Sequence, residues 1–124
     1  MTLRRFAVVL SVATALLAAS ACGAMHKQVT ERDKQSAGSY YQLALNYFTN
    51  NQIIESLQSL KDAVTYNPRD PQVHNLYGLI YLYKGMLPEA EKSFKSALLY
   101  DSKFSDASLN LAAVYMAQEK WKEA

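Results

Sequence analysis

Few side chains in this sequence are placed to do chemistry. The two histidines, His26 and His74, have no cysteine and no paired acidic residue near them at metal-ligand spacing, and His74 occupies a position that suits a packing residue. The sequence also lacks a glycine-rich phosphate loop and a serine nucleophile motif. We therefore expect no enzyme activity, no metal or other cofactor and no small-molecule substrate.

Three aspartates are better explained by helix capping than by acid and base chemistry. Asp70, Asp101 and Asp106 fall where helices are expected to begin. An aspartate at that place accepts hydrogen bonds from the free backbone N–H groups of the first helical turn. The one side chain that invites chemistry is therefore the single cysteine, Cys22.

Cys22 follows a segment with the composition of an export signal. Arg4 and Arg5 precede an apolar run from Phe6 to Ala19, and small residues lead from there to the cysteine. A basic start, a short apolar run and a small-residue cleavage site are typical of a secretory signal peptide. The run is shorter than the roughly 20 residues of a membrane-spanning helix. We predict that residues 1–21 are a signal peptide.

The sequence Ala19-Ser20-Ala21-Cys22 resembles the bacterial lipoprotein box, with Ala19 where that pattern prefers leucine. The resemblance implies cleavage before Cys22 and a lipid anchor on its thiol, with acyl chains such as palmitate holding the protein to a bilayer. Gly23 in place of aspartate is similar to lipoproteins sent to the outer membrane, where the protein would face the periplasm. The alternative is a secreted protein with an ordinary cleavage site and a spare thiol.

Removal of the signal peptide leaves a chain with balanced charge. Arg4 and Arg5 are two of the 13 lysines and arginines, and the eleven that remain match eleven aspartates and glutamates. A neutral chain has no basic field that would attract nucleic acid or anionic lipid. Residues 22–36 are polar, mixed in charge and without apolar periodicity, so we expect them to form a tether.

The rest of the sequence repeats with a period of 34 residues. The copies begin at Ala37, Pro71 and Ser105, and no insertion separates them. Large, aliphatic and small residues recur in the same order in each copy. The matching positions are Tyr40, Leu43, Ala44, Tyr47, Ser56, Leu60, Ala63 and Pro68 in the first copy, His74, Tyr77, Gly78, Tyr81, Ala90, Phe94, Ala97 and Ser102 in the second, and Ser108, Leu111, Ala112, Tyr115 and Ala124 in the third.

This period and residue order are identified as those of the tetratricopeptide repeat. The resemblance implies an all-α solenoid of antiparallel helix pairs, with repeats at 37–70 and 71–104 and an incomplete repeat at 105–124. Small residues at the helix crossings would let paired helices approach closely. Because the third copy has no capping helix, we expect the sequence to be part of a longer chain. The expected helices are 37–50, 53–66, 71–84, 87–100 and 105–118, with a sixth beginning at Trp121.

The first helices of such a solenoid line a concave surface, and we expect a protein partner to bind there. Peptide-binding repeats of the chaperone-docking type carry Lys, Arg and Asn at this surface. This chain carries mainly apolar residues, which favours an amphipathic helix or a hydrophobic segment over a carboxylate. The alternative is that some of these side chains pack against neighbouring repeats or against a missing C-terminal portion of the chain. The predicted groove residues are Tyr41, Leu45, Phe48, Asn75, Leu79, Leu82, Tyr83, Leu109, Ala113 and Met116.

A lipoprotein signal, a short tether and an immediate repeat array resemble the pilotins, which are outer-membrane lipoproteins of type IV pilus biogenesis of the PilF, PilW and Tgl kind. Residues 73–78 and 110–115 are similar to that family's repeats. The resemblance implies a non-enzymatic scaffold that binds the secretin subunit and assists its assembly in the outer membrane. Two alternatives remain open. One is another lipid-anchored envelope scaffold, for cell-wall or outer-membrane protein assembly, and the other is a periplasmic enzyme with a catalytic domain beyond Ala124.

Overall fold

The computed structural model describes residues 28–123, and this part of the chain is all α-helical, which confirms the predicted fold class. The predicted signal peptide, Cys22 and His26 lie outside the described residues. Five helices follow one another along the described chain: α2 (Glu31–Thr49), α3 (Ile53–Tyr66), α4 (Pro71–Tyr83), α5 (Leu87–Tyr100) and α6 (Ser105–Glu123).

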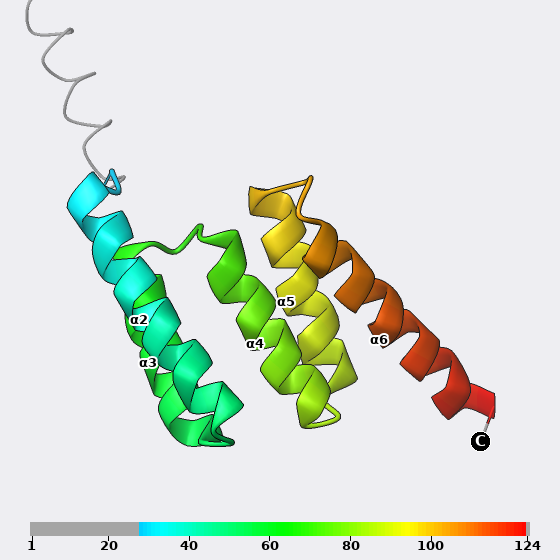
Figure 1. Ribbon diagram of the computed structural model, residues 1–124. Helices are drawn as coiled ribbons and strands as arrows, with labels where there is room; N and C mark the ends of the chain where they lie inside the picture. Colours follow the sequence, from blue (N-terminus) through cyan, green and yellow to red (C-terminus); the bar gives the residue numbers. More distant parts are fainter. Residues whose placement is uncertain (1–27, 124) are drawn as a thin grey trace, which may run out of the picture.

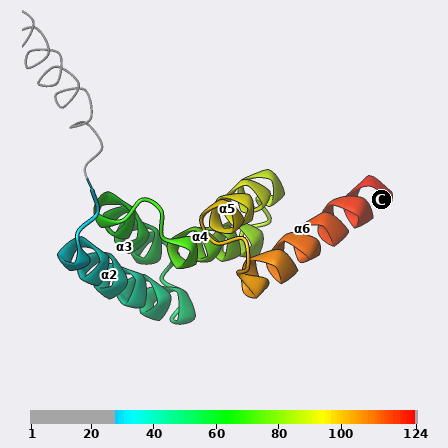
Figure 2. The same cartoon turned by 90° about the horizontal axis from the view of Figure 1, so that it is seen from above.

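The helices form antiparallel pairs that stand side by side. α2 packs against α3 and α4 packs against α5, while α6 lies against α5 at the end of the row (Figure 1). Seen from above, α3 lies on the same side of α2 as α5 does of α4 (Figure 2). The first helices α2, α4 and α6 also contact one another in sequence. They therefore form one layer of the row, as in a repeat solenoid.

Equivalent turns close the two complete helix pairs. Asn51 and Gly85 stand one 34-residue period apart, and both have left-handed backbone, with φ of 59° and 72°. The residue after each left-handed residue donates its backbone N–H to a carbonyl of the preceding helix. Gln52 donates to the Tyr47 carbonyl at 2.8 Å, and Met86 donates to the Tyr81 carbonyl at 2.9 Å. Asparagine and glycine reach this conformation at the lowest cost. This hydrogen-bond pattern is that of a helix ended by a left-handed residue.

The third copy lacks this turn. The position equivalent to Asn51 and Gly85 is Glu119, and α6 continues through it to Glu123. The predicted helix end at residue 118 and the predicted new helix at Trp121 are therefore wrong. Left-handed backbone costs a residue with a Cβ atom roughly 1–2 kcal/mol. Because residues 117–120 are also good helix formers, the helix runs on.

The first helix begins at Glu31 rather than at residue 37. Thr30 Oγ1 accepts a hydrogen bond from the Asp33 backbone N–H at 3.1 Å, and Asp33 Oδ2 accepts one from the Thr30 backbone N–H at 3.0 Å. This reciprocal pair is a capping box, which satisfies two free N–H groups at a helix start. Residues 31–36 are therefore helical and do not belong to a tether.

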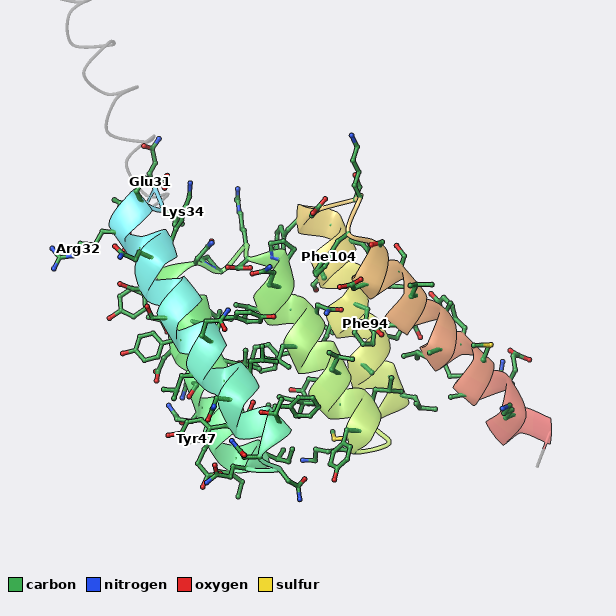
Figure 3. All side chains as sticks on the ribbon, in the orientation of Figure 1. Glu31, Arg32, Lys34, Tyr47, Phe94 and Phe104 are labelled. Carbon is green, nitrogen blue, oxygen red and sulfur yellow. The ribbon has the colours of Figure 1, made fainter. Side chains whose placement is uncertain are left out.

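Three charged side chains lie at the N-terminal end of α2. Glu31, Arg32 and Lys34 project away from the helix into the surroundings in Figure 3. The Lys34 ammonium lies 2.6 Å from the Glu31 carboxylate, and both side chains are more than half exposed. An exposed pair of this kind contributes little to stability, so the capping box is the feature that fixes the helix start.

The three aspartates singled out in the sequence differ in role. Asp70 is the N-cap of α4, and its carboxylate accepts a hydrogen bond from the Gln72 N–H at 2.9 Å. Asp101 instead ends α5, and its carboxylate accepts a bond from the Lys103 N–H at 3.0 Å in the following turn. Asp106 lies in the first turn of α6, where the helix dipole favours a negative charge. Of the three, Asp70 alone is an N-cap.

Two clusters of buried side chains stabilise the row. Leu79 of α4 packs against both clusters and so joins them. Every buried side-chain nitrogen or oxygen in the described residues has a hydrogen-bond partner. The first core cluster contains Ala44, Leu60, Ala63, Val73, Leu76 and Ile80, and the second core cluster contains Ala90, Phe94 and Val114.

Candidate protein-interaction surface

Small residues set the spacing of the helix pairs that carry the surface. A Cβ atom at Gly78 would lie 2.5 Å from the ring of Phe94, which is fully buried and projects from the middle of α5 (Figure 3). The equivalent Ala44 is also buried, and its carbonyl accepts a hydrogen bond from Ser56 Oγ at 2.8 Å. In the third copy the equivalent Ala112 is exposed. The small residues therefore allow close helix contact in the two complete pairs.

The same ring contact recurs in both complete repeats. Tyr40 stacks on Tyr66 with ring centroids 5.6 Å apart, and one period later His74 lies against Tyr100 with centroids 5.2 Å apart. His74 Nε2 is 2.8 Å from the Pro68 carbonyl oxygen, and because a carbonyl only accepts, this nitrogen carries the proton. His74 is thus part of the packing between paired helices.

Half of the predicted groove residues contribute to the packing between helices. They are half-buried rather than exposed. Side chains on α2 lie against the first core cluster, Leu82 lies against the second, and Leu79 lies against both. These side chains therefore pack within the fold and are not free to form an open groove. The residues concerned are Tyr41, Leu45, Phe48, Leu79 and Leu82.

Three other predicted groove residues are exposed apolar or aromatic side chains. Tyr83, Leu109 and Met116 are 64%, 70% and 62% exposed. The Tyr83 hydroxyl donates a hydrogen bond to Asn51 Oδ1 at 3.0 Å, and its ring meets Phe48 edge-on with centroids 6.2 Å apart. Tyr83 thus bridges the two repeats, whereas Leu109 and Met116 extend from α6 into solvent. These three side chains are the part of the predicted groove that a partner could cover.

Asn75 has a partner that the sequence did not suggest. Asn110 Nδ2 donates a hydrogen bond to Asn75 Oδ1 at 3.1 Å, and the pair is partly buried between α4 and α6. Asn110 follows Asn75 by one residue more than a full period, so a comparison of equivalent positions does not pair them. This contact fixes the start of α6 against α4. Ala113, one helical turn further on, is half-buried.

The Tyr41 side chain of α2 is partly buried and interacts with two carboxylates, Asp70 at the start of α4 and Asp106 at the start of α6. Burial raises the pKa of the Tyr41 hydroxyl, and the negative charges of Asp70 and Asp106 raise this pKa further. The phenol is therefore neutral at physiological pH and available as a hydrogen-bond donor.

A polar cluster joins α5 to α6. Glu91 accepts hydrogen bonds from Lys95 Nζ at 2.6 Å, from Gln118 Nε2 at 3.0 Å and from the Tyr115 hydroxyl at 3.5 Å. Hydrogen bonding to Lys95, and then to Gln118, lowers the pKa of the Glu91 carboxyl. No motif in the sequence marks this cluster, because it forms only when the second half of α6 lies along α5.

The described residues offer little for other kinds of site. Among residues 28–123, no group of three or more His, Cys, Asp or Glu side chains is placed to hold a metal ion. No helix within the same range has the length and apolar character needed to cross a membrane.

The sequence model of the tetratricopeptide repeat matches residues 37–70 and 71–104, which is more than half of the chain. The chain therefore belongs to the tetratricopeptide repeat family. Such repeats form protein-interaction scaffolds, they bind peptide or protein partners, and they are typically non-catalytic.

Solved structures share this fold at low sequence identity. The TPR domain of Arabidopsis OM64 is 15% identical with a TM-score of 0.65, and the match covers 73% of this chain and 75% of that one. The first and second TPR domains of Spaghetti (RPAP3), each bound to the HSP90 peptide SRMEEVD, are 18% and 20% identical. Their TM-scores are 0.66 and 0.67, with coverage of 73% and 74% of this chain and of 71% and 85% of theirs. Comparison with curated protein sequences gives no match.

Proposed function

We propose that this chain is a lipid-anchored scaffold of the cell envelope whose row of first helices binds an apolar segment of a protein partner. The observation that carries this proposal is the exposure of Tyr83, Leu109 and Met116 on α4 and α6, at or beside the positions that the repeat register predicts for the concave surface. Apolar side chains that stay largely exposed on a folded repeat are candidates for an interface.

The chemistry of the predicted groove residues favours an uncharged apolar segment as the occupant. The Spaghetti (RPAP3) domains hold the peptide SRMEEVD, which carries three acidic residues. None of the predicted groove residues in this chain is a lysine or an arginine. An acidic peptide would lose its hydration here without gaining a cationic partner, and this costs binding energy. A hydrophobic segment or the apolar face of a helix has no such cost.

As the particular partner we propose a secretin subunit of the type IV pilus. The scaffold would assist the assembly of this subunit in the outer membrane. This step rests on the order of features in the sequence, which is a signal peptide, Cys22 in a lipoprotein box and then a repeat array. The capping box at Thr30 shortens the connection, because eight residues separate Cys22 from Glu31. They can reach at most about 29 Å when fully extended. An anchored protein of this kind would hold its repeats close to the bilayer.

The test of this function uses the exposed side chains. Leu79 and Leu82 pack against the core clusters, so their replacement would disturb the fold. A Leu109→Asp and Met116→Asp double variant should stay folded and bind the secretin roughly 30-fold more weakly, because losing two apolar anchors costs about 2 kcal/mol or more. The measurement is capture of the secretin from detergent extracts by the full lipid-anchored chain, with circular dichroism to verify folding.

Two matched controls separate this surface from the rest of the molecule. Ile54 on α3 and Leu99 on α5 are 81% and 77% exposed, so Ile54→Asp and Leu99→Asp make the same chemical change on the second helices. Both control variants should capture the secretin as the unmodified chain does. If the controls lose the secretin and the Leu109 and Met116 variant keeps it, the surface is wrongly assigned. If the wild-type chain captures no secretin, the secretin assignment is wrong.

A further inference from the structure

An open cavity lies between the start of α5 and the second half of α6. Its volume is about 700 Å³, within the range of roughly 300–1,000 Å³ that is usual for ligand sites. Its walls are mainly apolar, and the polar exceptions sit on α6. The lining residues are Gly85, Leu87, Pro88, Ala117, Gln118 and Lys122.

The internal repeat explains why this space is open. Gly85 and Ala117 line the cavity, and one period earlier the equivalent residues are Asn51 and Tyr83. Those two are joined by a hydrogen bond of 3.0 Å, and the Tyr83 ring also meets Phe48 edge-on. In the next copy a methyl group replaces the tyrosine side chain, and glycine replaces the asparagine. The cavity beside Gly85 and Ala117 therefore lacks both the tyrosine ring and the asparagine oxygen that fill the equivalent place in the preceding copy.

The walls of the cavity are fixed by contacts on both sides. Leu87 packs against the second core cluster. Gln118 Nε2 donates to Glu91 Oε2 at 3.0 Å, which holds the second half of α6 against α5. That bond uses the amide nitrogen of Gln118, so the carboxamide oxygen of this lining residue remains as an acceptor. The aliphatic stem of Lys122 adds apolar surface, while its ammonium pairs with Glu119 at 3.3 Å.

We propose that this cavity binds an aromatic side chain, a tyrosine in the best case, from the apolar segment of the protein partner. The proposal rests on the proposed function, because it names the side chain that anchors that segment. In the preceding copy, the position equivalent to this cavity is occupied by the Tyr83 side chain. Leu87, Pro88 and Ala117 provide apolar surface that a tyrosine ring could contact. The Gln118 oxygen takes the place of Asn51 as acceptor for the hydroxyl. Amphipathic rings of this kind dominate many interfaces.

The experiment uses N-acetyltyrosinamide as the probe and the full lipidated chain in detergent. Amide chemical shifts of Gly85, Ala117 and Gln118 are followed in NMR spectra during titration. The expected result is a saturable shift at these three amides, with N-acetylleucinamide giving an at least threefold weaker response at the same concentration. No response, or an equal response spread over all helices, would overturn the proposal.

Variants of the cavity itself sharpen this test. Gly85→Asn with Ala117→Tyr rebuilds the Asn51 and Tyr83 pair of the preceding copy, and asparagine tolerates the left-handed φ of 72° at Gly85. This double variant should keep its fold and lose the response to the probe. Leu99→Tyr adds the same side chain at an exposed place on α5 outside the cavity and should respond as the wild type does. A double variant that still responds would refute the site.

Two other occupants have outcomes of their own. If only a Trp121→Ala variant responds to the probe, the chain's own tryptophan competes for the cavity, and the assignment to a partner fails. If sedimentation shows a dimer that the double variant abolishes, a second copy is the occupant, and the assignment also fails. The proposed function is judged separately. A chain that binds the probe but captures no secretin overturns the secretin assignment alone, whereas a chain that captures the secretin without binding the probe overturns the aromatic anchor alone.

Discussion

A methyl group added at Gly78 should leave the protein less stable than a methyl group added at Gly38. Both glycines lie inside helices, Gly38 in α2 and Gly78 in α4. At Gly38 an added Cβ atom has no neighbour within 4 Å. At Gly78 it would lie 2.5 to 2.7 Å from three atoms of the Phe94 ring, which is fully buried.

The magnitude follows from two opposing effects. Alanine is favoured over glycine inside a helix by roughly 0.8–1.0 kcal/mol, and this gain applies to both positions. Overpacking a buried contact costs about 1–3 kcal/mol, and this cost applies at Gly78 alone. The Gly38→Ala variant should therefore gain about 1 kcal/mol in free energy of unfolding. The Gly78→Ala variant should lie about 1–3 kcal/mol below it, and Gly78→Leu should lie lower still.

Thermal and urea unfolding followed by circular dichroism measure this difference. For a domain of this size, each kcal/mol moves the midpoint by roughly 4–8 °C. A Phe94→Leu background tests the assigned cause, because a smaller side chain opposite residue 78 should reduce the cost of the added methyl group. The reasoning fails if Gly38→Ala and Gly78→Ala unfold at the same temperature, or if the Phe94→Leu background leaves the difference unchanged.

Three further predictions concern the anchor, a helix start and the polar cluster. Cys22→Ser should abolish membrane association and fatty-acid labelling while leaving the helical spectrum intact, and equal labelling of the variant would remove the case for a lipid anchor. Pro88→Ala, in the first turn of α5, should cost less than about 1 kcal/mol in thermal unfolding, because no N–H is needed there and only the restriction of the unfolded chain is lost. Glu91 has a pKa below its ordinary value of 4.5 when folded, so its contribution to stability is present above pH 4.5 and is lost as the pH falls through the folded pKa. The stability difference between the wild type and Glu91→Gln should therefore be constant above pH 4.5 and shrink below it in urea titrations, and a difference that grows on acidification would contradict this sign.

The fold could be predicted from the sequence because its rules are local. A 34-residue period, small residues such as Ala44 and Gly78, and turn residues such as Gly85 together specify paired helices. The two helix ends that were mispredicted depend on single residues. The polar composition of residues 22–36 indicated a tether, although Thr30 and Asp33 have the spacing of a capping box. The repeat pattern implied a turn at Glu119 that its side chain disfavours.

The surface was less predictable than the fold because exposure depends on neighbouring helices. Register alone cannot distinguish Leu79, which packs against two clusters, from Leu109, which is 70% exposed. Contacts between copies, such as Asn75 with Asn110, fall one residue out of step with the period. The cavity beside Gly85 could have been found by asking which residue in each copy replaces Tyr83.

Leu79 links the stability of the chain to the occupancy of its surface. In a linear array each repeat is stabilised by its neighbours, and Leu79 is the one side chain of the described residues that packs against both core clusters. A residue at a predicted groove position therefore adds to the coupling between the two clusters, beside the Tyr83 contacts with Asn51 and Phe48. A partner that covers Leu79 would strengthen the coupling between the repeats as well as its own binding. Ligand binding and folding would then be thermodynamically linked, and Leu79 would be one of the side chains that carry this linkage.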